Sequence, residues 1–193
     1  MTALPLTAPL TPTHELRPTA QLRQGRPEDA EALLQLISRH ADEGHLLPRT
    51  LADLRARAPR FVVADASAAI VACAELAPLS PQVAEIRSLV VAPDARGQGV
   101  ARRMVAALAQ RARRDGFDRL CAFAHDPIFF VQLGFSLVPH QWIPEKISVD
   151  CAGCALFRQC GQSAVLLRLA EGDVPWSSER LIAASPVVAS HAS

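Results

Sequence analysis

The chain has 193 residues, enough for one domain with a substantial core but too few for two domains of ordinary size. Twenty Lys and Arg against nineteen Asp and Glu give a net charge of +1, so no overall positive field favours nucleic acid or anionic membranes. The most apolar stretch, residues 61–79, is interrupted by Asp65 and Glu75 and is too broken to span a bilayer. The first twenty residues lack the pattern of a secretory signal. We therefore expect a cytoplasmic protein with a small-molecule partner, no nucleic acid and no membrane.

Flexible tails are predicted over residues 1–19, which are rich in Pro, Thr and Leu without regular periodicity, and over residues 171–193, which end in small residues, Ser and Pro. The domain between them, residues 20–170, is expected to begin with a helix at Pro27, because Pro followed by two acidic residues suits a first helical turn. A second helix is predicted over residues 50–57, with Thr50 as its N-cap. Three strands follow, at residues 61–64, 69–76 and 82–91.

The second half of the sequence alternates helices and strands. A helix is predicted from Gly99 to about Arg114, because Val100, Met104 and Leu108 fall on one apolar face. The next elements are a strand at 119–124, a short helix at 128–133, a turn at 134–135 into a further strand, and a last strand at 164–169. Antiparallel strands followed by a strand-loop-helix-strand unit predict an α/β (α+β) fold, with a mixed, mainly antiparallel central sheet and helices on both faces.

The most informative segment is the loop Arg96-Gly97-Gln98-Gly99-Val100-Ala101, which joins a strand to an arginine-bearing helix. Free N–H groups at a helix start, the positive end of the helix dipole and glycines that let an anion approach the backbone form a cradle for a diphosphate. The loop lacks the patterns of dinucleotide-binding and ATP-binding loops, so neither of these ligands is expected. The alternative is that the two glycines only form a turn.

This region resembles the GNAT acetyltransferase superfamily, whose signature Arg/Gln-x-x-Gly-x-Gly/Ala is matched by Arg96, Gly99 and Ala101. The strand before the loop and the segment 129–135 are also similar to elements of that family. The resemblance implies acetyl-CoA as co-substrate, with oriented backbone donors that polarise its thioester carbonyl. The residues implied to bind its pantetheine and pyrophosphate are Leu89, Val90, Val91, Arg96, Gly97, Gln98, Gly99, Val100, Ala101 and Arg102.

Two charged residues precede the loop on the same strand. Alternation puts Glu85 and Arg87 on one face, and Leu89 and Val91 on that face too if no bulge intervenes. A carboxylate close to an acceptor amine can take its proton, and a neighbouring arginine can bind an acceptor carboxylate in a bidentate pair. We therefore predict Glu85 as the catalytic base, with an ordinary salt bridge on a solvated face as the alternative.

The string 85–91, the segment 144–147 and the sequence Asp150-Cys-x-x-Cys resemble the acetyltransferase domain of N-acetylglutamate synthase. This resemblance implies direct transfer of acetyl to the α-amino group of L-glutamate, the first step of arginine biosynthesis, with Arg87 and Lys146 as carboxylate clamps. The alternative for Lys146 is a surface position with its stem on Trp142 and Ile143. Many such synthases carry an arginine-binding, kinase-like domain, for which the chain has no room. A separate kinase-like chain and a homodimer are therefore the candidate assemblies.

The sequence departs from the family in its aromatic residues. It contains no tyrosine, and Phe130 stands where many GNAT enzymes have a tyrosine general acid. His125 is a candidate replacement because an imidazole titrates near neutrality, and a structural histidine is the alternative.

Three of the five cysteines lie close together in the sequence, at Cys151, Cys154 and Cys160. Three soft ligands within ten residues, two of them in Cys-x-x-Cys spacing, suit a structural zinc, with Asp150 or His140 as a fourth ligand. Three free thiols packed as small hydrophobic groups are the alternative.

Two rival functions stay open at this point. One is a GNAT acetyltransferase for another amino acid, a small amine or a protein N-terminus. The other is a non-catalytic, acetyl-CoA-binding regulatory subunit, which would bind CoA without turnover.

Overall fold

A seven-stranded sheet runs through the computed structural model, which describes residues 20–41, 49–66, 68–154 and 159–169. The predicted tails, residues 1–19 and 171–193, lie outside this part of the chain. The strand order is β1-β2-β3-β4-β5-β7-β6, and β4 and β5 are parallel while all other neighbours are antiparallel. The strands are β1 (Gln21–Gln24), β2 (Phe61–Ala66), β3 (Ala69–Pro78), β4 (Val83–Val91), β5 (Arg119–Ala124), β6 (Ser136–Val138) and β7 (Ser163–Arg168). The predicted mixed, mainly antiparallel sheet is confirmed.

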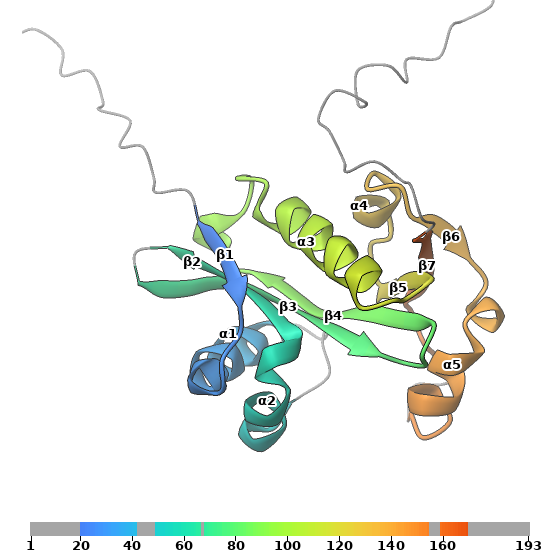
Figure 1. Ribbon diagram of the computed structural model, residues 1–193, viewed down its shortest axis with the longest axis horizontal. Coiled ribbons are helices and arrows are strands. Elements are labelled where there is room, and N and C mark those ends of the chain that lie inside the picture. The colour runs from blue at the N-terminus through green and yellow to red at the C-terminus, as the bar shows by residue number, and fades with distance from the viewer. Residues whose placement is uncertain (1–19, 42–48, 67, 155–158, 170–193) are drawn as a thin grey trace, which may run out of the picture.

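Helices cover both faces of this sheet, as Figure 1 shows. α1 (Ala30–Ala41) and α2 (Leu51–Arg57) pack on one face, where their apolar residues form a buried cluster with β2, β3 and β4. α3 (Val100–Arg114) packs on the other face through the predicted apolar residues Val100, Met104 and Leu108. No helix of the described residues is both long enough and apolar enough to cross a membrane.

The predicted start signals of the first two helices are confirmed. Pro27–Asp29 form a 3₁₀ turn that leads directly into α1. The hydroxyl of Thr50 accepts a hydrogen bond from the Asp53 N–H at 3.1 Å, as expected of an N-cap.

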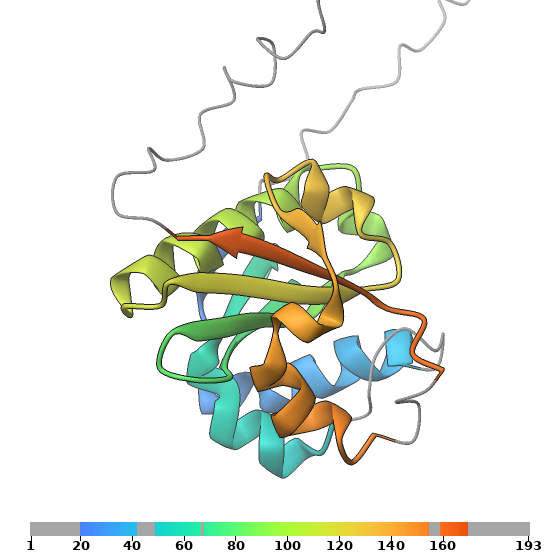
Figure 2. The ribbon, with the colours of Figure 1, turned by 90° about the vertical axis from the view of Figure 1, so that its right-hand side faces the viewer.

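The segment between β6 and β7 contains structure that the sequence did not predict. It holds a 3₁₀ turn (His140–Trp142), α5 (Pro144–Lys146) and a π-helical turn (Ile147–Cys151). The short helix α4 (Ile128–Val131), which the sequence did predict, comes before β6. Figure 2 shows α5 and the π-helical turn on the same side of the sheet as α1 and α2. This placement brings Lys146 and Asp150 to the face of β4 that carries Glu85.

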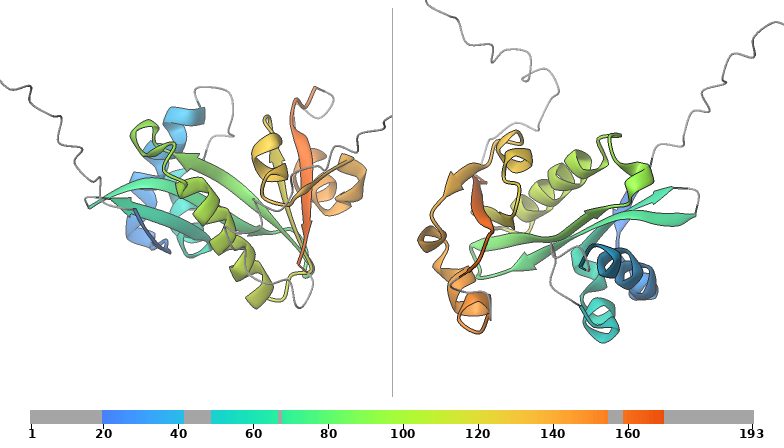
Figure 3. Two further views of the ribbon diagram at one scale, coloured as in Figure 1. Left: turned by 90° about the horizontal axis from the view of Figure 1, so that it is seen from above. Right: turned by 180° about the vertical axis from the view of Figure 1, so that it is seen from behind.

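The parallel strands β4 and β5 separate along their length. They pair only from Val83 opposite Arg119 to Ile86 opposite Ala122. β5 then follows β7, with which it pairs as far as Ala124 opposite Ser163, while β4 continues to Val91. The two strands diverge in the left view of Figure 3, so the backbone of β4 beyond Ile86 has no strand partner on its β5 side among the described residues.

A bulge interrupts β4 at the same place. Cys73 of β3 pairs with Val90 and Glu75 with Arg87, so β4 contains one extra residue between these pairs, and Ser88 has a φ of 49°. The alternation of β4 is therefore interrupted before Leu89, and Leu89 and Val91 do not share a face with Glu85. Beyond the bulge, Leu89 and Val91 pack with the α3 cluster, whereas Val90 packs with α1 and α2.

Candidate functional site

The glycine loop forms an open helix start. Gly97 and Gly99 have φ values of 74° and 72°, in the left-handed region that favours glycine, and apart from their chain neighbours no atom of the described residues lies within 4 Å of a Cβ built on either one. The first hydrogen bond of α3 joins the Arg103 N–H to the Gly99 carbonyl at 3.1 Å. The N–H groups of Val100 and Ala101 therefore have no acceptor within the helix. This loop fits an anionic group such as a diphosphate.

Arg96, the first residue of the family signature, holds the loop through side-chain contacts with β4 and α1. Its Nε donates to the Val91 carbonyl at 3.1 Å, and its Nη2 lies 2.9 Å from Nε2 of His40 in α1. Gln98 is held in the same way, through a 3.0 Å hydrogen bond from Nε2 to the Asp94 carbonyl. These side chains fix the loop between β4 and α1. The predicted contact with a pyrophosphate is therefore expected from the backbone N–H groups of the loop rather than from these side chains.

Four charged residues meet on the face of β4 that is turned away from α3. Glu85, with 3% of its surface exposed, accepts hydrogen bonds from Arg87 Nε at 2.6 Å and from Lys146 Nζ at 2.7 and 2.9 Å. Asp150 Oδ2 accepts from Arg87 Nη2 and lies 2.9 Å from Lys146 Nζ. The structure thus brings together the predicted base and both predicted clamps in a four-charge cluster: Glu85, Arg87, Lys146 and Asp150.

The burial of the cluster excludes the solvent-exposed alternatives for Lys146 and Arg87. Lys146 is not a surface lysine, because its side chain is 14% exposed and its Nζ lies 5.1 Å from the centre of the Phe123 ring. Arg87 is not on a solvated face either. Burial lowers the pKa of Arg87, but Glu85 and Asp150 more than offset that effect, so its pKa is raised and its charge is permanent.

A second buried carboxylate, Glu75, lies on the same face; in the sequence it stands out only as a break in an apolar stretch. Glu75 of β3 has no exposed surface and pairs with Arg87 across the β3–β4 ladder. Arg49, just before α2, donates from Nη2 to Glu75 Oε2 at 2.8 Å and lies 3.4 Å from the Ser88 hydroxyl at the bulge. An acidic residue inside an otherwise apolar strand was the available signal.

The candidate general acids are not in this cluster. Phe130 is buried and packs edge-to-face against Phe129 and Phe135, so it is a core residue. His125 is exposed just after β5. Cys121 pairs with Glu85 in the β4–β5 ladder, and burial together with Glu85 raises its pKa, which keeps it a neutral thiol.

The predicted zinc site is wrong for the described residues. No group of three or more His, Cys, Asp or Glu is placed there to hold a metal, and the three cysteines are free, with Cys151 and Cys154 half-buried and Cys160 exposed. Both expected fourth ligands have other partners, since Asp150 binds Arg87 and His140 Nε2 lies 2.9 Å from the Gln162 carbonyl.

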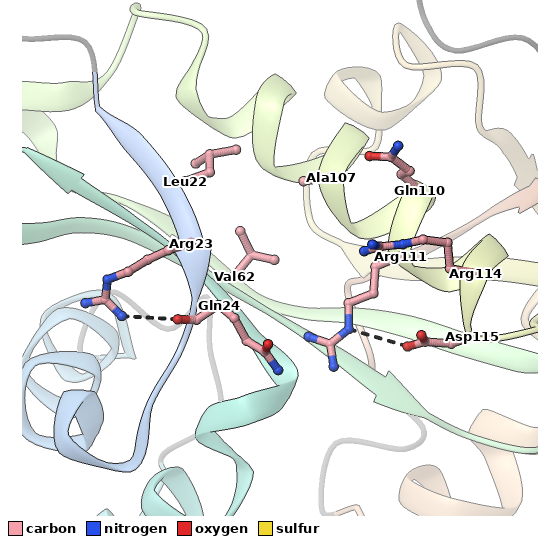
Figure 4. Close-up of a pocket in the computed structure, with 9 residues that line it drawn as sticks. All are labelled: Leu22, Arg23, Gln24, Val62, Ala107, Gln110, Arg111, Arg114 and Asp115. Carbon is pink, nitrogen blue, oxygen red and sulfur yellow. Dashed lines mark hydrogen bonds and ion pairs between the residues drawn. The ribbon is translucent and has the colours of Figure 1, made fainter.

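A surface hollow of about 450 Å³ lies between β1 and α3 (Figure 4). Arg111, which lines it, pairs with Asp115 at 3.4 Å and donates to the Pro59 carbonyl at 2.9 Å. The hollow borders the C-terminal half of α3, whereas the glycine loop forms the N-terminal end of that helix. It is therefore separate from the site built by the loop and β4.

The sheet opens between two parallel strands beside a glycine-rich helix start, and this arrangement is the fold of an N-acetyltransferase. The chain belongs to the acetyltransferase (GNAT) family, whose model matches residues 27–135.

Two curated relatives are similar to much of the chain. The chain is 27% identical over 148 residues to an uncharacterized N-acetyltransferase of Chlorobaculum tepidum, covering 77% of this chain and 96% of that protein. It is 31% identical over 126 residues to an amino-acid acetyltransferase of Ralstonia nicotianae, covering 64% of this chain and 28% of the relative.

Solved structures share the fold. N-acetylglutamate synthase from Neisseria gonorrhoeae, complexed with coenzyme A and N-acetyl-glutamate, has a TM-score of 0.71 and 24% identity, over 78% of this chain and 35% of that chain. A Mycobacterium tuberculosis protein in complex with CoA and NLQ has a TM-score of 0.67 and 25% identity, over 78% of this chain and 99% of that chain. This chain thus spans about a third of the length of the synthase.

Proposed function

We propose that the protein transfers acetyl from acetyl-CoA to the α-amino group of L-glutamate, the reaction of an N-acetylglutamate synthase. One observation carries the proposal: two cations, Arg87 and Lys146, lie side by side on a buried face next to the point where β4 leaves β5. Two cations suit an acceptor with two carboxylates. The similarity to an amino-acid acetyltransferase supports the same substrate class.

The acetyl donor would be bound by backbone groups on the other side of the bulge. The edge of β4 at Leu89, Val90 and Val91, which has no strand partner on its β5 side among the described residues, suits the pantetheine amides, and the N–H groups of residues 97–102 suit the pyrophosphate. When bound, acetyl-CoA supplies an activated thioester carbonyl. A β4 N–H aimed at that carbonyl would stabilise the developing oxyanion.

In the proposed acceptor complex, the ion pairs of the cluster exchange. Arg87 and Lys146 are bonded to Glu85 and Asp150 in this structure, so a carboxylate of the acceptor would replace one of these partners. An oxygen of Glu85 then becomes able to accept a proton from the attacking amine. Direct transfer of this kind needs no covalent enzyme intermediate.

We take residues 20–170 as the catalytic domain, and a second copy of the chain or a separate kinase-like chain as its candidate partner. The Ralstonia relative and the Neisseria synthase are both much longer than this chain, which covers 28% and 35% of them. Their additional parts are the reason to consider a second chain.

The test is release of free CoA from acetyl-CoA with L-glutamate, in parallel with L-aspartate, L-glutamine and no acceptor. Glutamate-selective release is expected. Release that is greater with another amine would move the function to a different GNAT substrate. Tight acetyl-CoA binding without release in any arm would instead favour a regulatory subunit.

A further inference from the structure

The two buried carboxylates on the acceptor face differ in their hydrogen bonds. Both oxygens of Glu85 are engaged, since Oε1 binds Lys146 and Oε2 binds Lys146 and Arg87. Glu75 uses only Oε2, which binds Arg49, while its buried Oε1 has no hydrogen-bond partner among the described residues. A buried carboxylate oxygen without a donor carries a desolvation penalty, so an unmet acceptor at a site marks a place for a ligand donor.

The surroundings of Glu75 leave its Oε1 open to an N–H donor such as an amine. The charged groups that face it are Arg49, which donates to Glu75 Oε2, and Arg87 of β4, which donates to Glu85 and Asp150; neither donates to Glu75 Oε1. Its own strand contributes the thiol of Cys73, whose pKa burial raises to about 12, so this group stays neutral. Among the described residues, α1, α2 and β2 contribute a cluster of buried apolar side chains to this face.

Glu75 is also next to the place where transfer would occur. It pairs with Arg87, the residue just before the bulge, and its partner Arg49 reaches the Ser88 hydroxyl within that bulge. Directly opposed residues on one face of an antiparallel pair lie about 5 Å apart at their Cβ atoms. Glu75 is therefore close to Arg87 and to the start of the β4 segment that has no strand partner on its β5 side.

We propose that Glu75 binds the amino group of the acceptor through Oε1 and accepts its first proton. This inference rests on the proposed function and extends it to a residue of β3. Because Glu75 has no exposed surface, the amine reaches it only when a neighbouring side chain moves. Arg49, whose side chain keeps 14% of its surface exposed, is the neighbour that has to shift.

The proton balance of the reaction leaves room for two carboxylates. An α-amino acid carries an ammonium group at neutral pH, which must lose one proton before nitrogen can attack the thioester carbonyl. Glu75 takes this first proton. After the N–C bond forms and the C–S bond breaks, the nitrogen loses a second proton, which the proposed function assigns to Glu85. One proton ends on the CoA sulfur and the other leaves to solvent.

The experiment compares Glu75→Gln with the wild type across pH. A variant that cannot deprotonate the ammonium depends on free amine from solution, whose concentration rises tenfold per pH unit below the amine pKa. At pH 7 we expect kcat/KM for the acceptor to fall about 100-fold, with the KM for acetyl-CoA unchanged. The deficit should shrink about tenfold with each pH unit above 7. Glu75→Asp keeps a carboxylate and should keep the wild-type pH profile.

Two matched variants separate binding from a purely structural role. Glu145, on α5, also has a buried oxygen without a hydrogen-bond partner and binds Arg119 at 2.7 Å, so Glu145→Gln makes the same chemical change outside the cluster. It should keep the wild-type pH profile. Arg49→Lys tests whether Glu75 only positions Arg49. A Glu75→Gln deficit that is constant with pH and equal to that of Arg49→Lys would overturn the proposal.

The outcome is separable from that of the proposed function. If the wild type prefers another amine, the same profiles are measured with that amine, and Glu75 is judged on them. If no amine supports turnover, calorimetry of L-glutamate with CoA-saturated wild type and Glu75→Gln decides. Binding lost in the variant supports the assignment, whereas equal binding, or binding to neither protein, overturns it.

Discussion

Replacing Lys146 by Met should destabilise the protein through the charge cluster. Lys146 is the one lysine in the sequence and bonds to both acidic members of the cluster, Glu85 and Asp150. Without it, two carboxylates share the single guanidinium of Arg87. Removing one partner of a fully buried ion pair costs about 3–5 kcal/mol. The Asp150 side chain is 32% exposed, which places the expected loss at the lower end, about 3 kcal/mol.

A loss of that size is readily measured by thermal and urea unfolding. For a domain of this length, 1 kcal/mol corresponds to a change in Tm of about 2–4 °C, so the expected drop is about 6–12 °C. Lys146→Arg keeps the positive charge and should lose much less. The double variant Glu85→Gln, Lys146→Met should lose less than the sum of the single changes, because it removes the uncompensated carboxylate. A Tm within about 2 °C of the wild type for Lys146→Met would refute this account of the cluster.

Four further outcomes follow from the site. Glu85→Gln should lower kcat about 100-fold without changing the KM for acetyl-CoA, and an unchanged rate across pH would remove it as a base. Arg87→Ala should raise the KM for glutamate at least tenfold, and an unaltered glutamate dependence would defeat its role as a clamp. Gly99→Ala should weaken acetyl-CoA binding, measured by calorimetry, because a φ of 72° strains any residue with a Cβ. Burial raises the pKa of Cys73 and Cys121, so neither thiol should react with iodoacetamide in the native protein at pH 8, as mass spectrometry of digests would check.

The fold was predictable where the pattern of the sequence is strong. The helix after the glycine loop has a regular apolar face, and the strand 119–124 has the same bounds in the structure as in the prediction. β1 was missed because Gln21–Gln24 is short and mostly polar, as an edge strand can be, and its pairing with β2 determines it. The turns around α5 were missed because Pro144–Lys146 is too short to have a periodicity.

The site was predictable along one strand but not between strands. Alternation placed Glu85 and Arg87 on one face, and the structure confirms their contact. The roles of Glu75 and Arg49 depend on the register of β3 against β4, which no single segment of sequence contains. The bulge was equally hidden, because Ser88, at a φ of 49°, is not a residue that marks a left-handed position.

The single extra residue in β4 changes which side chains of this strand face each side of the sheet. Up to Arg87 the charged side chains point toward α1 and α2, whereas from Leu89 onward the alternation is reversed, and Leu89 and Val91 point toward α3. A regular strand that kept Ser88 in the ladder would exchange inside for outside along the whole second half of β4, whereas removing Ser88 would leave Leu89 and Val91 on their present face. One further residue inserted into the regular part of β4 would turn Leu89 and Val91 toward α1 and α2, unless a second bulge accommodated it.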